Sequence, residues 1–205
     1  MKKFIICFLI WFINFSFVYA DGKVALSNFL KVKDLTINAQ FTQTIKGKKK
    51  NQISNGLMQI SRPNKFRWQY DDDGQLILSD GKKVYIYDKE LKQVTIKNLN
   101  DSLGRSPAVI LAGSMDVEKY YKIKNEPEHN GLEWVSLQPK NNDDNGSLRF
   151  VEIGFDQKTG KLAQMNFIDN FNNKSMVKFE NVQMGMKFPE TTFKFVKSKD
   201  VDVLY

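Results

Sequence analysis

The sequence contains one cysteine and one histidine among its 205 residues, Cys7 and His129. Cys7 lies within the first twenty residues, so the rest of the chain can form no disulfide and has no thiol chemistry. Zinc sites take several ligands, mostly histidine and cysteine. We therefore predict no metal site, and we interpret His129, in a Pro-Glu-His-Asn-Gly turn, as a solvated loop residue.

The common catalytic and nucleotide-binding motifs are missing too. The chain has no G-x-S-x-G elbow, no P-loop and no dinucleotide-binding glycine pattern. Asp71 to Gly74 resembles the start of a calcium loop, but Lys82 occupies the position that needs a bidentate glutamate. We assign no catalytic residue, predict no cofactor, and do not expect an enzyme.

The long apolar run of the chain lies at its N-terminus. Lys2 and Lys3 precede an unbroken apolar stretch over residues 4–13, and small residues end at Ala20. This order predicts a secretory signal peptide over residues 1–20, because a membrane helix needs about 20 apolar residues. Residues 21–205 are then expected to form one exported domain, and an uncleaved anchor is the alternative.

Basic residues outnumber acidic ones, 31 to 23, which gives a formal net charge of +8. The densest basic run, residues 46–50 (KGKKK), is interpreted as a solvated loop. A basic exported protein can meet anionic lipid head groups or an acidic partner surface. Nucleic acid is not expected as a partner outside the cytoplasm.

Turn signals such as Asn55-Gly56 and Asn130-Gly131 divide most of the chain into short segments of alternating polarity. Roughly ten such strands with few helices predict one large antiparallel sheet, curled or closed into a barrel. Near-helical apolar spacing predicts a helix over residues 23–34. Pro107 and Gly113 bound a second helix over residues 106–113, and a third is expected over residues 116–121.

Five motifs resemble the periplasmic outer-membrane lipoprotein carrier family (LolA-type). In chain order they are FTQ at 41–43, RPNKFRW at 62–68, SDGK at 79–82, PAVILA at 107–112 and TFKF at 192–195, the last resembling a near-terminal strand. The sequence departs from the family where the tail reads VKSKDVDV instead of Pro-Pro-x-Gly. It departs again where the 106–113 helix ends in Gly113 rather than a basic residue.

The resemblance implies an incompletely closed antiparallel β-barrel of about ten to eleven strands, whose apolar concave face is covered by the helices at 23–34 and 106–113. It implies a soluble, monomeric periplasmic chaperone that shields the acyl chains of lipoproteins. The cargo would come from an ATP-driven release complex in the inner membrane and pass to an outer-membrane receptor.

Arg62 is the residue in these motifs that most needs a physical explanation. Period-two alternation places it on the same face as Met58 and Ile60. An unpaired buried guanidinium is very costly, and the free carbonyls at the end of the 106–113 helix would accept its hydrogen bonds. We predict that Arg62 latches this helix shut, and a structural arginine without a switching role is the alternative. With Leu30, which the resemblance adds, the predicted latch is Arg62, Leu30, Leu111 and Ala112.

The residues expected to contact acyl chains are Met58, Ile60, Phe66, Trp68, Val109 and Ile110. An ordinary sandwich core is the alternative for these apolar rows. The main functional alternative is a periplasmic lipid- or lipoprotein-sensing regulatory domain of similar fold. The outer-membrane receptor of related fold would need a cysteine at the cleavage site, where Ala20 and Asp21 stand. A carrier that also inserts its cargo stays open.

Overall fold

The computed structural model describes residues 21–47, 49–102, 106–140 and 148–205, and the predicted signal peptide lies outside these ranges. The described residues form one sheet of twelve strands. The strands are β1 (Thr36–Lys46), β2 (Gln52–Ser61), β3 (Lys65–Tyr70), β4 (Leu76–Asp80), β5 (Lys83–Asp88), β6 (Gln93–Asn98), β7 (Tyr121–His129), β8 (Leu132–Pro139), β9 (Phe150–Asp156), β10 (Leu162–Ile168), β11 (Lys174–Met184) and β12 (Asp202–Leu204). The helices are α1 (Gly22–Lys31), α2 (Pro107–Leu111) and α3 (Val117–Tyr120), with 3-10 turns η1 (Asn100–Ser102) and η2 (Glu190–Phe193).

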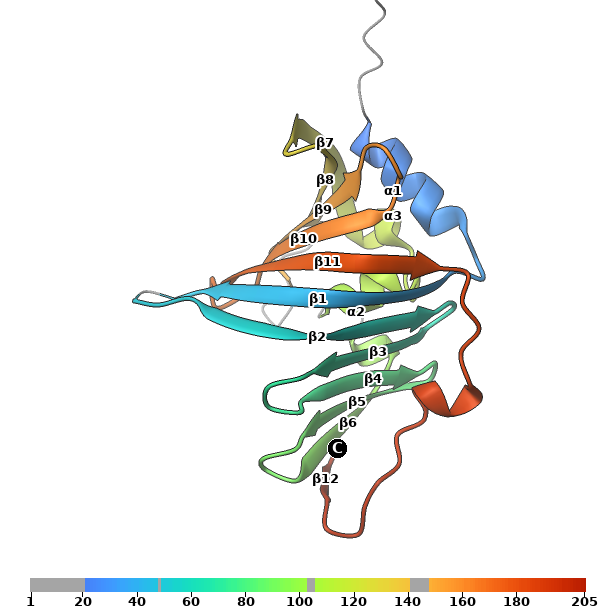
Figure 1. Cartoon of the computed structure of the whole chain (residues 1–205), viewed down its shortest axis with the longest axis vertical. Helices are drawn as coiled ribbons and strands as arrows, with labels where there is room; N and C mark the ends of the chain where they lie inside the picture. Colours follow the sequence, from blue (N-terminus) through green and yellow to red (C-terminus); the bar gives the residue numbers. More distant parts are fainter. Residues whose placement is uncertain (1–20, 48, 103–105, 141–147) are drawn as a thin grey trace, which may run out of the picture.

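The strand order is β12-β6-β5-β4-β3-β2-β1-β11-β10-β9-β8-β7. Sequential hairpins build one half from β1 to β6 and the other from β7 to β11, and the pairing of β1 with β11 joins them. Strands β7 and β12 end the order on opposite sides, so the sheet is open (Figure 1). The predicted incompletely closed barrel is confirmed, with twelve strands rather than ten or eleven.

The inner face follows from alternation along each strand. In β1, Ile37, Ala39 and Phe41 are buried while their neighbours are more exposed. Gly56 of β2 stands opposite Phe41, and a Cβ there would lie 2.7 Å from the Phe41 ring and 2.0 Å from the Gln69 carbonyl oxygen. Glycine at this position therefore lets the ring lie flat over the strand.

Two short helices cover this face, and their caps are readable in the sequence. The Asp21 carboxylate accepts from the amides of Lys23 and Val24 at 3.0 and 3.2 Å and begins α1, which packs against β7, β8 and β9. The Ser106 hydroxyl accepts from the Ala108 amide at 3.3 Å and begins α2. The predicted helix over residues 23–34 is thus shorter than expected, since α1 ends at Lys31.

The strand expected at residues 192–195 is wrong. The 3-10 turn η2 ends at Phe193, and Phe195 stacks on Tyr85 with ring centroids 5.2 Å apart. Phe193 is buried. The two phenylalanines of this motif therefore pack against other side chains, and their backbone does not pair as a strand of the sheet.

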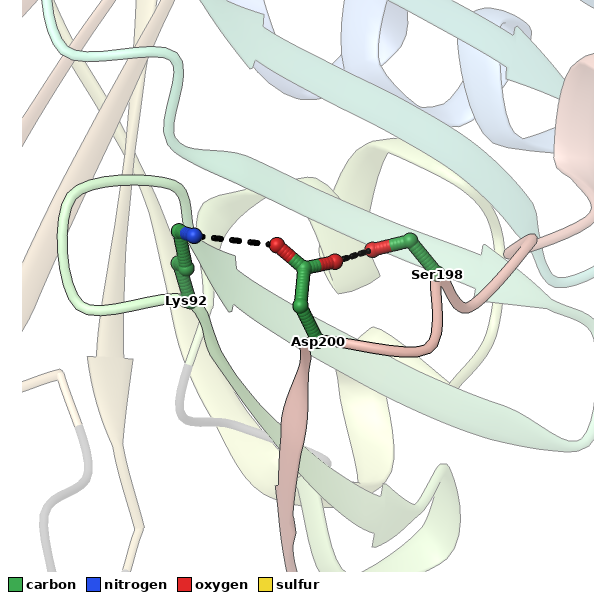
Figure 2. Close-up of polar contacts among 3 residues, drawn as sticks. All are labelled: Lys92, Ser198 and Asp200. Carbon is green, nitrogen blue, oxygen red and sulfur yellow. Dashed lines mark hydrogen bonds and ion pairs between the residues drawn. The ribbon is translucent and has the colours of Figure 1, made fainter.

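The tail forms a strand that its sequence did not indicate. Strand β12 runs parallel to β6, whereas the other strand pairs of the described residues are antiparallel. Figure 2 shows the contacts that precede it: the Lys92 ammonium pairs with the Asp200 carboxylate at 3.0 Å, and the Ser198 hydroxyl donates to the same carboxylate at 2.5 Å. The tail thus extends the sheet beyond β6.

Candidate functional site

Helix α2 lies within the interior of the protein rather than on its surface. Residues 108–112 are all buried, and they belong to one apolar cluster that also includes α1 and the inner face of the sheet. A helix of five residues has little stability of its own in water. Its position therefore depends on the contacts that surround it.

Arg62 follows β2 and extends its guanidinium between the ends of α1 and α2. Its Nε and Nη2 donate to the Leu111 carbonyl at 3.1 and 2.8 Å. Its Nη1 donates to the carbonyls of Phe29 at 2.6 Å and Val32 at 3.1 Å. One side chain therefore connects both helices that cover the inner face.

The charge of Arg62 is stabilised by dipoles and a ring. The residue is 7% exposed, and burial lowers the pKa of its guanidinium to about 10, which still leaves it protonated near neutral pH. Carbonyls at the ends of helices carry partial negative charge, and the guanidinium carbon lies 4.4 Å from the centre of the Phe29 ring. No carboxylate of the described residues pairs with Arg62.

Backbone hydrogen bonds join the same segments, namely the turn after β2 and the ends of α1 and α2. We call this junction the seam. The Arg62 amide donates to the Leu35 carbonyl at 2.9 Å, and the Asn64 amide donates to the Ala112 carbonyl at 3.2 Å. Gly113 has φ +65°, and a Cβ there would lie 3.1 Å from both Cδ and Nε of Arg62. Glycine at the end of α2 therefore permits both the helix end and the close approach of the arginine.

The predicted latch residues meet at this seam, with one difference in α1. The Leu111 carbonyl accepts from the Arg62 side chain, and the Ala112 carbonyl accepts from the backbone that follows Arg62. At the end of α1 the acceptors are the carbonyls of Phe29 and Val32. Leu30, which was predicted to take part, is instead half-buried and lines two pockets described below. Sequence reasoning missed Phe29 and Val32 because it ran the first helix to residue 34, which hid the free carbonyls at its end.

The six residues predicted to contact acyl chains are all buried in the apolar cluster: Met58, Ile60, Phe66, Trp68, Val109 and Ile110. Sequence reasoning missed Phe41 and Phe179, whose rings lie 5.0 and 6.0 Å from the Trp68 ring. The alternation of their strands was the available signal. Together with α2, these side chains fill the apolar interior of the structure.

Open space lies outside α2, along α1. A pocket of about 490 Å³ has an apolar floor of Leu26, Leu30 and Ile123, with lysines 23, 122 and 140 among its other lining residues. A second pocket of about 330 Å³ is lined by Leu30, Gly113 and Met115, among others. The larger pocket therefore borders α1, and the smaller one lies between α1 and the segment that follows α2.

Other classes of site find no support in the described residues. No group of three or more histidine, cysteine, aspartate or glutamate side chains among them could hold a metal ion. His129 stacks on Trp134, with ring centroids 4.7 Å apart. None of the helices in this part of the chain has the length and apolar character to cross a membrane.

Comparison with known proteins gives a consistent result. The family model described as "Outer membrane lipoprotein carrier protein LolA" matches residues 33–196. The outer-membrane lipoprotein carrier protein of Chromobacterium violaceum is 38% identical over 170 residues, 82% of this chain and 81% of that protein. Its namesake in Nitrosospira multiformis is 35% identical over 202 residues, 97% of this chain and 96% of that protein.

A solved structure supports the fold alone. An uncharacterized conserved protein from Thermus thermophilus aligns with a TM-score of 0.51 at 12% identity, over 89% of this chain and 98% of that one. The alignment covers most of both chains, so the overall fold is one that a solved protein shares.

Proposed function

The chain belongs to the outer membrane lipoprotein carrier family, LolA, and on that premise we propose that it is a soluble periplasmic chaperone for lipoproteins. It shields the acyl chains of its cargo in the apolar interior and delivers them toward the outer membrane. The observation that carries this proposal is Arg62, which holds a short apolar helix within the apolar interior through hydrogen bonds to carbonyls alone.

The energetics of acyl-chain binding explain why such a cover is useful. Each buried methylene contributes about 0.8 kcal/mol, so one long acyl chain contributes on the order of 10 kcal/mol. A cavity that was always open would bind its cargo too tightly to release it. A cover that must be displaced lowers the net affinity.

Arg62 has the properties needed for such a cover. A hydrogen bond to a charged group is worth about 1.5–3 kcal/mol net. Arg62 makes two to the Leu111 carbonyl, which cargo would have to break when it displaces α2, and two more hold the guanidinium to the end of α1. The closed state then competes with the cargo-bound state, and closure over the empty cavity favours release. Arg62, Phe29, Val32 and Leu111 are the residues of this latch.

The same family membership supports a proposal for the wider cycle. Residues 1–20 direct export, and residues 21–205 act in the periplasm. The protein receives lipoproteins from an ATP-driven release complex of the inner membrane and gives them to an outer-membrane receptor. A shuttle between two membranes favours a monomer. The sensing alternative finds no support among the relatives, which are named as carriers.

A release assay tests the proposal. Spheroplasts that hold a radiolabelled lipoprotein and a competent export complex are incubated with the purified exported protein. The expected result is a soluble one-to-one complex of the protein and the lipoprotein. Lipoprotein that stays in the membrane fraction, with a protein shown to be folded, would contradict the carrier function and favour the sensor.

A further inference from the structure

A polar cluster lies inside the same apolar interior, at the N-terminal end of α2. The Tyr70 hydroxyl donates to the Gln43 amide oxygen at 2.6 Å. Trp68 stands two residues before Tyr70 on β3, and the Phe41 ring packs on both, with centroids 5.0 and 5.1 Å away. Polar side chains are rare in this core, so their grouping needs an explanation.

The Trp68 indole nitrogen is buried near the Tyr70 hydroxyl, and none of the residues that the structure describes completes a well-formed hydrogen bond with it. A buried donor without an acceptor destabilises a protein, and most such donors are paired. Trp134 shows the usual solution, because its equally buried indole donates to the His129 carbonyl at 3.1 Å. Trp68 therefore has a donor available for a group from outside the chain.

Trp68 also lines a small pocket. It has a volume of about 40 Å³, and its lining includes Gln43, Trp68 and Tyr70 from the sheet and Ser106 and Pro107 from the start of α2. That volume is enough for a water molecule or a single carbonyl group and far too small for an acyl chain. The pocket therefore fits the polar end of an acyl group rather than its hydrocarbon.

The protonation of the Tyr70 hydroxyl determines how Gln43 is hydrogen-bonded. Burial raises the pKa of Tyr70 to about 12, Asp73 adds to the rise, and the adjacent Trp68 indole opposes it. The hydroxyl thus stays protonated and holds the Gln43 oxygen. This leaves the Gln43 amide nitrogen, like the Trp68 indole, as a donor.

We propose that this pocket is a carbonyl-binding subsite, in which Trp68 and Gln43 donate hydrogen bonds to the ester or amide carbonyl that joins an acyl chain to its cargo. The proposal rests on the carrier function proposed above and adds a basis for position and selectivity. Apolar burial is non-directional, so methylene contacts alone leave a chain free to slide. A hydrogen bond at its head end fixes the chain against the sheet, at β1 and β3.

Two synthetic lipopeptides with equal chain lengths test this proposal, one with ester-linked and one with ether-linked chains. The wild-type protein should bind the ester form about fivefold more tightly, the effect of one buried hydrogen bond. Trp68→Phe should bring this ratio close to one; any change in apolar contact affects both forms and cancels in the ratio. Trp134→Phe makes the same change at an indole outside the pocket and should keep the preference.

A spectroscopic measurement covers the case in which Trp68→Phe does not fold. The ester carbonyl is labelled with carbon-13, and its infrared band in complex with the wild-type protein should shift to lower frequency than in an apolar solvent. An unshifted band, or equal binding of the ester and ether forms, would refute the subsite and leave the carrier function intact. Failure of the folded wild-type protein to bind either form would instead contradict the carrier function.

Phospholipids also carry acyl esters, so the source of the carbonyl needs its own comparison. The ester lipopeptide is competed with a diacyl phospholipid of the same chains. Stronger binding of the lipopeptide would identify cargo as the source, and stronger binding of the phospholipid would overturn that assignment.

Discussion

Arg62 and Lys92 each connect another segment of the chain to the sheet. Arg62 does so in a buried environment and Lys92 in an exposed one. Arg62 is 7% exposed and bonds to backbone carbonyls at the ends of α1 and α2. The Lys92 side chain is 62% exposed and pairs with a similarly exposed Asp200 at the tail. Water and salt weaken the exposed pair, whereas a buried cation that loses its partners is strongly destabilised.

This difference shows where a switch can be built. Because the Arg62 contacts form together in a water-poor seam, they are expected to break together when α2 moves. We therefore expect two distinct states, one closed and one open, whose balance a ligand can shift. The tail contact exchanges gradually with water and can set only the local order of β12.

The largest expected effect is that of Arg62→Leu. The variant should still bind lipoprotein, because the apolar cavity is unchanged, but closure no longer helps to expel the cargo. Transfer to the outer-membrane receptor should fall by at least about tenfold, a change of 1.4 kcal/mol or more. The measurement is the rate at which labelled lipoprotein leaves the purified complex for membranes that contain the receptor.

Arg62→Lys is the matched control for charge. A lysine keeps the cation but lacks the planar fork that reaches two helices at once, so transfer should stay well below that of the wild type. Transfer by Arg62→Leu at the wild-type rate would contradict the latch.

A smaller effect is expected for Gly113→Ala. The substitution places a Cβ 3.1 Å from the arginine at φ +65°, which should destabilise the closed state by about 1–3 kcal/mol and raise the affinity for a fluorescent acyl probe. Gly131→Ala has a similar φ of +70° and no neighbouring atom within 4 Å. It should lower the urea midpoint without changing probe affinity. Equal probe affinities for the two variants would argue that the close contact between Gly113 and Arg62 does not stabilise the closed state.

The smallest effect belongs to the tail, and it depends on pH. The Ser198 hydroxyl, with Lys92, lowers the pKa of Asp200 from 3.8 to about 2. Since the pKa is depressed in the folded state, the stabilisation is present above 3.8 and disappears as the pH falls toward 2. The protection of the Asp202 amide, which donates to the Lys92 carbonyl at 2.9 Å, should then fall relative to the intrinsic exchange rate at each pH.

Asp200→Asn is the control for this titration. The variant has no carboxylate to protonate, so exchange of the Asp202 amide should be faster at neutral pH and should lose the acid-dependent step. An identical acid profile in the wild type and the variant would show that another group controls the tail.

The sequence predicts the parts of this molecule that local patterns determine. Alternation in β2 placed Met58, Ile60 and Arg62 on one face, and the caps Ser106 and Gly113 bounded α2. These features depend on neighbours within a few residues, which the sequence displays directly. The family motifs then gave the curvature of the sheet, which no local pattern encodes.

The rest depends on tertiary contacts. Which carbonyls of α1 meet Arg62 is decided by how the helix ends over the turn after β2, so Phe29 and Val32 could not be chosen in advance. Strand β12 has three residues and exists because the edge of β6 is free to pair with it. Gln43 was visible in the FTQ motif, but its role depends on Tyr70, far along the chain.

The most direct test of the central claim is hydrogen exchange at the amides of α2, compared between the empty protein, the protein loaded with an acyl-chain ligand, and Arg62→Leu. The amide of Ala112, bonded to the Ala108 carbonyl at 2.9 Å, is the most informative probe. We predict slow exchange in the empty wild type and fast exchange in both other samples. Equally slow exchange in all three would contradict a cover that Arg62 holds and cargo displaces.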